Sequence, residues 1–104
     1  MVSITRCVLE IGDQKMAIYV DKPLWTFRGV RHAHMVSDES YEELHLFASK
    51  IGFPRRAFQG DHYDIPEYLI EEAIAMGAIS VSPRELLGRL KGAGLRLRPR
   101  QRDV

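Results

Sequence analysis

Residues 78–85 read Ala-Ile-Ser-Val-Ser-Pro-Arg-Glu, and this stretch joins a strand signal directly to a helix signal. The first half, 78–81, is a short apolar run with β-branched residues, which is typical of a buried strand. Ser82 and Glu85 form a capping box, in which a hydroxyl and a carboxylate satisfy free amides at a helix start. Pro83 suits the first helical position because its φ is already helical. The stretch therefore predicts a strand that leads straight into a helix.

The same alternation of strand and helix signals extends towards the N-terminus. Further apolar runs predict three more strands, at 17–20, around 34–36 and at 55–58. Apolar residues at helical spacing predict two more helices, one after the capping box that starts at Ser40 and one after Pro66. Strands separated by helices favour parallel pairing through right-handed crossovers. We therefore expect a small single α/β domain over residues 16–95, with a mainly parallel sheet of about four short strands and three helices.

Composition limits the classes of protein to which this chain can belong. The 104 residues are 45% hydrophobic and carry a formal net charge of +1, which describes one globular domain and not a disordered or fibrous chain. The charge gives no whole-molecule attraction to nucleic acid, and the apolar runs are too short to cross a bilayer. A single cysteine, Cys7, excludes an internal disulfide. No secretory segment is visible, so we predict a cytoplasmic protein without a membrane partner. The oligomeric state stays open.

The two ends of the chain have separate interpretations. Residues 1–15 are either upstream sequence read through in frame before a natural start at Met16, or an additional edge strand, since they are rich in β-branched residues. Residues 96–104 form a basic tail with four arginines. The tail could contact nucleic acid or another phosphate, although a frayed basic terminus has the same composition.

Polar side chains follow each of the predicted strands. Asp21 ends the first strand, Ser37 and Asp38 end the second, and Ser82 ends the fourth. The third strand leads into residues 59–66, which read Gln-Gly-Asp-His-Tyr-Asp-Ile-Pro. Ligands of open parallel sheets bind beyond the carboxyl ends of the strands, where loops and helix starts converge. The sequence therefore predicts a binding or catalytic site at this edge of the sheet.

Within this edge, we assign acid–base chemistry to His62, with Asp61 and Asp21 as its catalytic partners. An imidazole with a pKa of about 6.5 exchanges protons near neutrality, and neighbouring carboxylates tune that pKa. The alternative is that His62 is an ordinary surface histidine in a turn. The residues predicted to bind the ligand are Trp25, Arg28, Arg55, Tyr63, Asp64, Ser37 and Asp38. Asp64 has a second interpretation, because with a glutamate three residues later it could simply cap the following helix.

A divalent metal ion is a further possibility that the histidines raise. In an extended segment, the two imidazoles of His32-Ala33-His34 lie on one face, and such nitrogens suit zinc or a similar metal. The expected ligands are Asp21, His32, His34 and His62. This spacing alone is weak evidence, because folding must bring the remaining ligands together.

Several unusual short motifs follow one another along the chain. They are Tyr19-Val20-Asp21-Lys22-Pro23-Leu24-Trp25, His34-Met35-Val36-Ser37-Asp38, Glu43-Leu44-His45, Phe47-Ala48, Pro54-Arg55-Arg56-Ala57-Phe58 and Asp61-His62-Tyr63-Asp64. In these motifs and their order, the chain resembles a small bacterial and phage family catalogued as domain of unknown function 4031, from about residue 16 to residue 95. The resemblance implies no activity, substrate or catalytic residue. It does imply that both ends of the chain lie outside the shared pattern.

Two functions of different classes fit these residues. The first is a phosphoesterase or nucleotide-processing enzyme, in which the carboxylates hold a divalent metal or orient water, His62 moves a proton, and Arg55 or Arg28 neutralises phosphate charge. The second is a module without catalysis that binds a nucleotide, nucleic acid or protein through Trp25, Tyr63, His62 and the arginines. Both predict a phosphate-bearing ligand as the broad class of partner.

Overall fold

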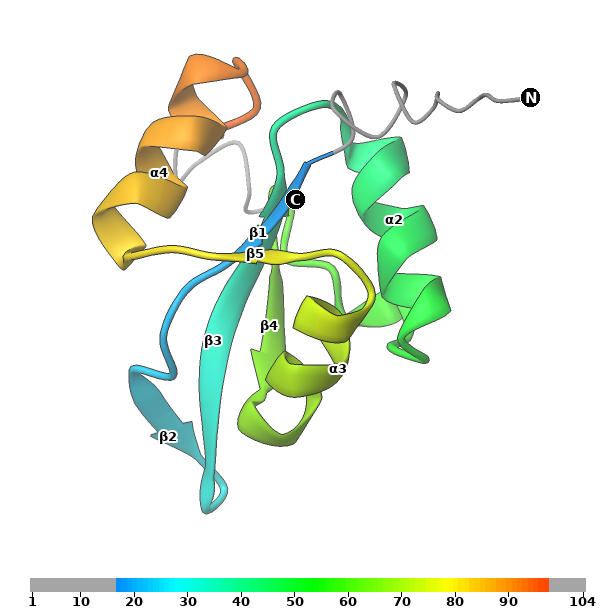
Figure 1. Cartoon of the computed structure of the whole chain (residues 1–104), viewed down its shortest axis with the longest axis vertical. Helices are drawn as coiled ribbons and strands as arrows, with labels where there is room; N and C mark the ends of the chain where they lie inside the picture. The colour runs from blue at the N-terminus through cyan, green and yellow to red at the C-terminus, as the bar shows by residue number, and fades with distance from the viewer. Residues whose placement is uncertain (1–16, 98–104) are drawn as a thin grey trace, which may run out of the picture.

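The computed structural model describes residues 17–97 as a mixed five-stranded sheet with helices on both of its faces (Figure 1). The sequence predictions for residues 1–15, and for most of the tail at 96–104, fall outside the described residues. Within residues 17–97, the small α/β domain and its three α-helices are confirmed. None of the helices within residues 17–97 has the length and hydrophobicity needed to cross a lipid bilayer.

The longest strand, β3 (Val30–Ser37), forms the centre of the sheet. Along one edge it pairs antiparallel with β1 (Ile18–Val20) and then with β2 (Trp25–Phe27). Along the other edge it pairs antiparallel with β4 (Tyr63–Pro66). The short β5 (Ile79–Ser80) adds to the outside of β1, and this is the parallel pair of the sheet.

The prediction of a mainly parallel sheet was therefore wrong, and the turn after β2 explains why. Arg28 and Gly29 have φ values of 54° and 81°. Two consecutive residues with positive φ are typical of the tight turns that join antiparallel strands in a hairpin, because their twist matches that of the strands. The chain thus returns directly through β3, which therefore runs antiparallel to β2 and β1.

The third predicted strand was also misplaced. Residues 55–58 instead form the 3₁₀ helix η2 (Arg55–Ala57), in which both arginines are exposed. The strand lies later, at β4, within the 59–66 block that was expected to follow the third strand. Tyr63 and Ile65 are fully buried on one face of β4, whereas Asp64 between them is half-buried on the other. This alternation of period two characterises a strand, and the charged side chains of the block obscured it.

The helix starts follow the predicted capping chemistry. In α2 (Tyr41–Lys50), Oγ of Ser40 accepts a hydrogen bond from the Glu43 amide at 3.0 Å. In α4 (Pro83–Gly92), Ser82 accepts from the Glu85 amide at 3.1 Å. The short α3 (Ile70–Ala75) begins after the 3₁₀ helix η3 (Glu67–Leu69) without a side-chain cap. Asp64 lies in β4, so its interpretation as a helix cap was wrong.

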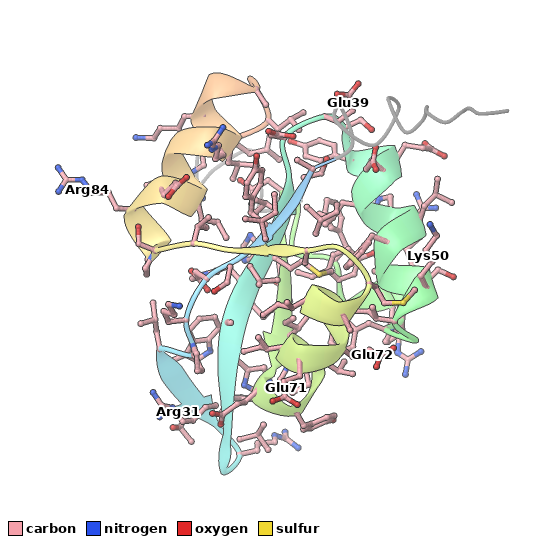
Figure 2. All side chains as sticks on the ribbon, viewed as in Figure 1. Arg31, Glu39, Lys50, Glu71, Glu72 and Arg84 are labelled. Atoms are coloured by element: carbon pink, nitrogen blue, oxygen red, sulfur yellow. The ribbon has the colours of Figure 1, made fainter. Side chains whose placement is uncertain are left out.

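The two faces of the sheet pack against different helices. Val20, Met35 and Ile65 belong to the larger core, which α2 and α3 cover. Tyr19 and Val36 point to the other face, where they pack on Leu86 and Leu90 of α4. Figure 1 shows α4 on the opposite side of the sheet from α2 and α3. The side chains of Lys50 and Arg84 point away from the body of the domain (Figure 2).

Candidate metal centre

A row of three polar side chains crosses the sheet on the α4 face. Asp64 of β4 lies directly opposite His34 of β3, and Asp21 follows β1 opposite the same histidine. Residues opposite each other in antiparallel strands project to the same face, as do residues two apart in one strand. His62, two residues before Asp64, therefore joins the row. Strand register thus brings together residues from three separate parts of the sequence.

Asp21 holds His34 through both of its carboxylate oxygens. The backbone N–H of His34 donates to Oδ1 at 2.7 Å, and Nδ1 of its ring lies 2.7 Å from Oδ2. Asp21 is only 1% exposed, so these two contacts replace the water that its carboxylate loses on burial. β1 ends at this position because Pro23, two residues later, has no N–H to continue the ladder.

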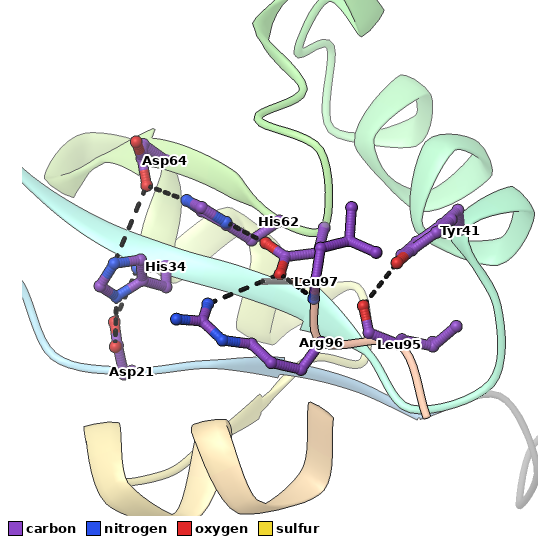
Figure 3. A network of polar contacts seen from close by, with 9 residues as sticks. Asp21, His34, Tyr41, His62, Asp64, Leu95, Arg96 and Leu97 are labelled. Atoms are coloured by element: carbon purple, nitrogen blue, oxygen red, sulfur yellow. Dashed lines mark hydrogen bonds and ion pairs between the residues drawn. The ribbon is translucent and has the colours of Figure 1, made fainter. Parts of the chain in front are cut away.

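Asp61 supports His62 in a similar manner. Nδ1 of His62 lies 2.7 Å from Oδ1 of Asp61, which is fully buried. The other oxygen accepts the backbone N–H of Leu97 at 2.9 Å and lies 3.5 Å from the guanidinium of Arg96. The chain reaches Asp61 through Gly60, whose φ of 95° is a conformation that glycine adopts readily. Asp61 therefore links His62 to the C-terminal segment (Figure 3).

The free nitrogens of the two histidines converge on Asp64. Oδ1 of Asp64 lies 3.1 Å from Nε2 of His62 and 4.0 Å from Nε2 of His34. One ligand atom from each of these three residues falls within 4.8 Å of the others. Because a carboxylate only accepts hydrogen bonds, Nδ1 of each histidine carries the hydrogen in its bond to Asp21 or Asp61. In the neutral ring, Nε2 then has a lone pair that points into the cluster.

The protonation of His62 reflects this surrounding charge. Burial by itself lowers the pKa of His62, but hydrogen bonds to Asp64 and Asp61 and the charges of both carboxylates outweigh burial and raise it above the ordinary value. In the charged ring, the Nε2 proton lies between the imidazole and Asp64. A metal cation bound here would replace that proton, because both need the same lone pair and the same carboxylate.

A pocket of about 260 Å³ opens beside the cluster. Asp21, His34, His62 and Arg96 form its polar wall, while its apolar wall consists of Val36 and four residues of α4: Pro83, Leu86, Leu87 and Leu90. A ligand there would contact the histidines on one side and an aliphatic surface on the other. The polar cluster is thus accessible to a small molecule.

The structure brings together five of the residues that the sequence singled out: Asp21, His34, Asp61, His62 and Asp64. Trp25 packs against this cluster, with its ring centroid 4.6 Å from that of His34. His32 lies on the same face, but its Nδ1 contacts the carbonyl of Val30 at 3.0 Å. Arg28 lies at the hairpin turn, with its guanidinium over the ring of Phe27.

Four other residues predicted to bind a ligand lie elsewhere. Tyr63 is fully buried on the α2 side, where its hydroxyl contacts His45. Arg55 lines a separate hollow beside α2. Ser37 accepts the backbone amides that lead into α2, and Asp38 accepts a hydrogen bond from Tyr19.

Two features of the site were missed by the sequence analysis. The list of expected metal ligands left out Asp64, which was predicted to bind a ligand, to cap a helix or, as one of the carboxylates, to hold a metal or orient water. The spacing of His62 and Asp64 carries a signal for it, because residues two apart in a strand share a face. Arg96 was assigned only to the basic tail, and nothing in its local sequence indicates a contact with Asp61.

Comparisons with known proteins give one positive result. No curated protein and no solved structure matches the chain significantly. A family model described as "Protein of unknown function (DUF4031)" matches residues 18–93, which contain the three candidate ligands His34, His62 and Asp64. Because this match spans well over half of the chain, the protein belongs to the DUF4031 family.

Proposed function

We propose that this protein is a metal-dependent phosphoesterase, with a divalent ion held by Nε2 of His34, Nε2 of His62 and a carboxylate oxygen of Asp64. The observation that supports it is the convergence of two imidazole nitrogens on one carboxylate, with each ring held from behind by a buried aspartate. A histidine that binds a metal usually donates its other N–H to a carboxylate or carbonyl, which orients the ring and raises its basicity.

The donor set favours a transition metal. Two imidazole nitrogens and one carboxylate oxygen suit Zn²⁺, Fe²⁺ and related ions better than Mg²⁺ or Ca²⁺, which prefer oxygen ligands. Three protein ligands leave coordination positions for water and substrate, as in catalytic metal sites. A metal in such a site lowers the pKa of bound water and polarises a phosphoryl oxygen. Asp21 and Asp61 then orient ligands, in place of the direct catalytic role that the sequence analysis predicted for them.

Arg96 supports a substrate that carries negative charge. Its guanidinium lines the same pocket as His34 and His62. The planar fork of an arginine matches the oxygens of a phosphate, and its charge offsets the charge that develops during phosphoryl transfer. The pocket is slightly smaller than the range of about 300–1,000 Å³ that is usual for drug-sized ligands. A phosphoryl group with part of its ester substituent fits this size.

The first experiment measures metal binding and hydrolysis together. Metal-free protein is titrated with Zn²⁺, Mn²⁺ and Fe²⁺, metal content is measured after desalting, and hydrolysis of p-nitrophenyl phosphate and bis-p-nitrophenyl phosphate is followed. We expect one tightly bound ion per chain and turnover that a chelator abolishes. His34→Ala, His62→Ala and Asp64→Ala should each lose more affinity than the roughly 10–100-fold typical of losing a supporting hydrogen bond.

The matched control is His45→Gln, because His45 is a part-exposed histidine whose ring contacts Tyr63 and Phe58 outside the cluster. This variant should bind metal and turn over substrate as the wild type does. Failure of the wild-type protein to retain any of the metals and to hydrolyse either ester would contradict the proposal.

The apolar wall of α4 favours a second candidate, which is a binding module without turnover. Leu86, Leu87 and Leu90 offer an aliphatic surface to one side of the pocket. Such a surface holds an apolar group of a ligand without contributing to phosphoryl transfer. Stable binding of a phosphate ester by the metal-loaded protein, with no product formed, would favour this second function over the first.

A further inference from the structure

The hairpin of β2 and β3 carries an aromatic surface next to the metal centre. Trp25 and Phe27 project to the same face of β2, and the cross-strand partner of Trp25 is His32. We call Trp25, Phe27 and His32 the aromatic face. It lies on the same side of β3 as His34, because His32 and His34 are two residues apart.

The aromatic face is accessible where the hairpin extends beyond α4. α4 packs on the other end of β3, at Val36. The side chain of Phe27 is 58% exposed, and a hollow of about 330 Å³ is lined by the aromatic face together with Ala57, Gln59 and Asp64. Asp64 therefore borders both this hollow and the metal centre. One end of a molecule bound in the hollow would lie beside the residues that are candidates to hold the metal.

The ring geometry suits a flat ligand. The rings of Trp25 and His32 are stacked, with an interplanar angle of 22° and centroids 6.0 Å apart. The ring of Phe27 meets His32 edge-on at 6.2 Å. Phe27 is exposed, and Trp25 and His32 are half-buried. Accessible aromatic rings stack on nucleobases, since every base has a π-face. Gln59 and Asp64, at the border of the hollow, add polar groups that can bond to the edge of a base.

Charge distinguishes this surface from one that would fit an apolar or cationic partner. Residues 22–37 contain Lys22, Arg28 and Arg31 and no aspartate or glutamate. The guanidinium of Arg28 lies over the ring of Phe27, whereas Arg31 projects to the opposite face of the hairpin and donates to the carbonyl of Pro23 (Figure 2). A cation next to an exposed ring is the combination that binds single-stranded nucleic acid, where phosphates alternate with bases.

We propose that the aromatic face binds the base of a nucleotide unit whose phosphate lies at the metal centre. The substrate class is then a nucleobase carried beside a phosphate, either in a free nucleotide or in a single-stranded nucleic acid. This inference rests on the proposed phosphoesterase function. It adds a preference for substrates that carry a nucleobase, which the metal centre by itself would not have.

The test uses the one tryptophan of the chain as its signal. A base that stacks on Trp25 quenches its fluorescence, so the metal-loaded full-length protein is titrated with adenosine 5′-monophosphate, a short oligothymidylate and inorganic phosphate. We expect quenching by the first two probes and none by inorganic phosphate. Tighter binding of the oligonucleotide than of the mononucleotide identifies a single strand as the substrate, and the reverse order identifies a free nucleotide.

Phe27→Ala is the decisive variant, because its exposed side chain contributes little to folding. It should weaken the binding of adenosine 5′-monophosphate by about fivefold or more, as expected for the loss of one stacking contact. Tyr68→Ala, which removes another exposed ring from η3, is the control and should bind as the wild type does. Both variants should keep the wild-type metal content and thermal midpoint.

The outcomes separate the two proposals. Equal nucleotide affinity of the wild type and Phe27→Ala, or the absence of quenching by both base-containing probes, overturns the role of the aromatic face even if aryl phosphates are hydrolysed. Weaker nucleotide binding by Phe27→Ala in a protein that binds no metal and hydrolyses no ester supports the aromatic face and overturns the phosphoesterase.

Discussion

The two aspartate–histidine pairs have the same contact distance but different supports. Asp21 and His34 come from neighbouring strands, and both oxygens of Asp21 serve His34. Asp61 and His62 are adjacent in sequence, and the second oxygen of Asp61 serves the C-terminal segment. The first pair therefore depends on strand register and the second on where the chain end lies. Two histidines can be oriented for one centre by unrelated structural means.

The largest expected effect concerns the support that the second pair shares with the C-terminus. Asp61→Ala removes a buried charge that holds His62, Arg96 and the amide of Leu97. Loss of one partner from a buried ionic cluster costs roughly 3–5 kcal/mol. Urea unfolding of the metal-free variant should show a decrease of this size in the free energy of unfolding.

The comparison predicts a smaller decrease in the free energy of unfolding when the first pair, Asp21 and His34, is broken. Asp21→Ala leaves the His34 amide and ring without their partner, and an unsatisfied buried donor costs about 1–3 kcal/mol. The same urea measurement tests this difference. Equal destabilisation by the two variants would show that the C-terminal contacts of Asp61 add nothing to stability.

The metal affinity should fall by a similar amount when the aspartate of either pair is replaced. In Asp21→Asn and Asp61→Asn, the amide can no longer fix the hydrogen on Nδ1 as a carboxylate does, so each histidine loses its orientation for the metal. Substitution of such supporting residues lowers metal affinity about 10–100-fold. Competition with a chromophoric chelator measures this loss. Unchanged affinity in both variants would indicate that His34 and His62 are not ligands.

Leu97→Pro tests the comparison further, because it removes the N–H that donates to Asp61 in the second pair. The amide of Leu97 donates to Asp61 at 2.9 Å, and proline has no such donor. A hydrogen bond to a charged group contributes roughly 1.5–3 kcal/mol. We expect a loss of stability near the lower value, together with weaker metal binding. Leu97→Ala keeps the N–H and is the control that should retain both properties.

The smallest expected effect is the pH dependence of stability in the metal-free protein. The pKa of His62 is raised in the folded state, because its bonds to Asp64 and Asp61 outweigh burial. Its contribution is therefore complete below the unfolded pKa of about 6.5 and is lost as the pH rises through the folded pKa. The stability difference between the wild type and His62→Gln, measured with a chelator present, should shrink from about pH 6 to about pH 8.

For His45, the same measurement should give a pH dependence of stability with the opposite sign. Burial, followed by the charge of Arg55, lowers the pKa of His45. Its contribution is present above the unfolded pKa and is lost as the pH falls through the folded pKa. The stability difference between the wild type and His45→Gln should therefore grow with pH. Identical pH slopes for the two variants would contradict the assignment of different surroundings to the two rings.

Local signals in the sequence located the helix starts and three of the strands, β1, β3 and β5, but they missed β2 and misplaced β4. Ser40 and Ser82 cap their helices as expected, because a capping box involves residues only three positions apart. The Arg28-Gly29 turn was not recognised, and its hairpin reversed the expected direction of β3. The charged residues of the 59–66 block likewise hid β4, since strand pairing involves partners about thirty residues away.

The residues of the candidate site also fall into two groups, those that the sequence could suggest and those that it could not. The adjacent residues Asp61 and His62 formed a pair that the sequence could suggest, as it could suggest His34 from its spacing to His32. Arg96 and the apolar wall of α4 could not be anticipated, because they reach the pocket from the far end of the chain. Tyr63, beside two site residues, points into the core, which only the direction of β4 decides.

The amino-acid sequence by itself determined the chemical groups of this protein, its helix starts and its small α/β class. Those properties follow from residue types and short spacings, which act locally. Only the tertiary structure decided that Asp21, His34 and Asp64 lie in one row and that His62 faces them. Strand register is set by the turn of the hairpin and by the burial of one whole face of the sheet, and a shift of one residue would have moved these side chains into the core.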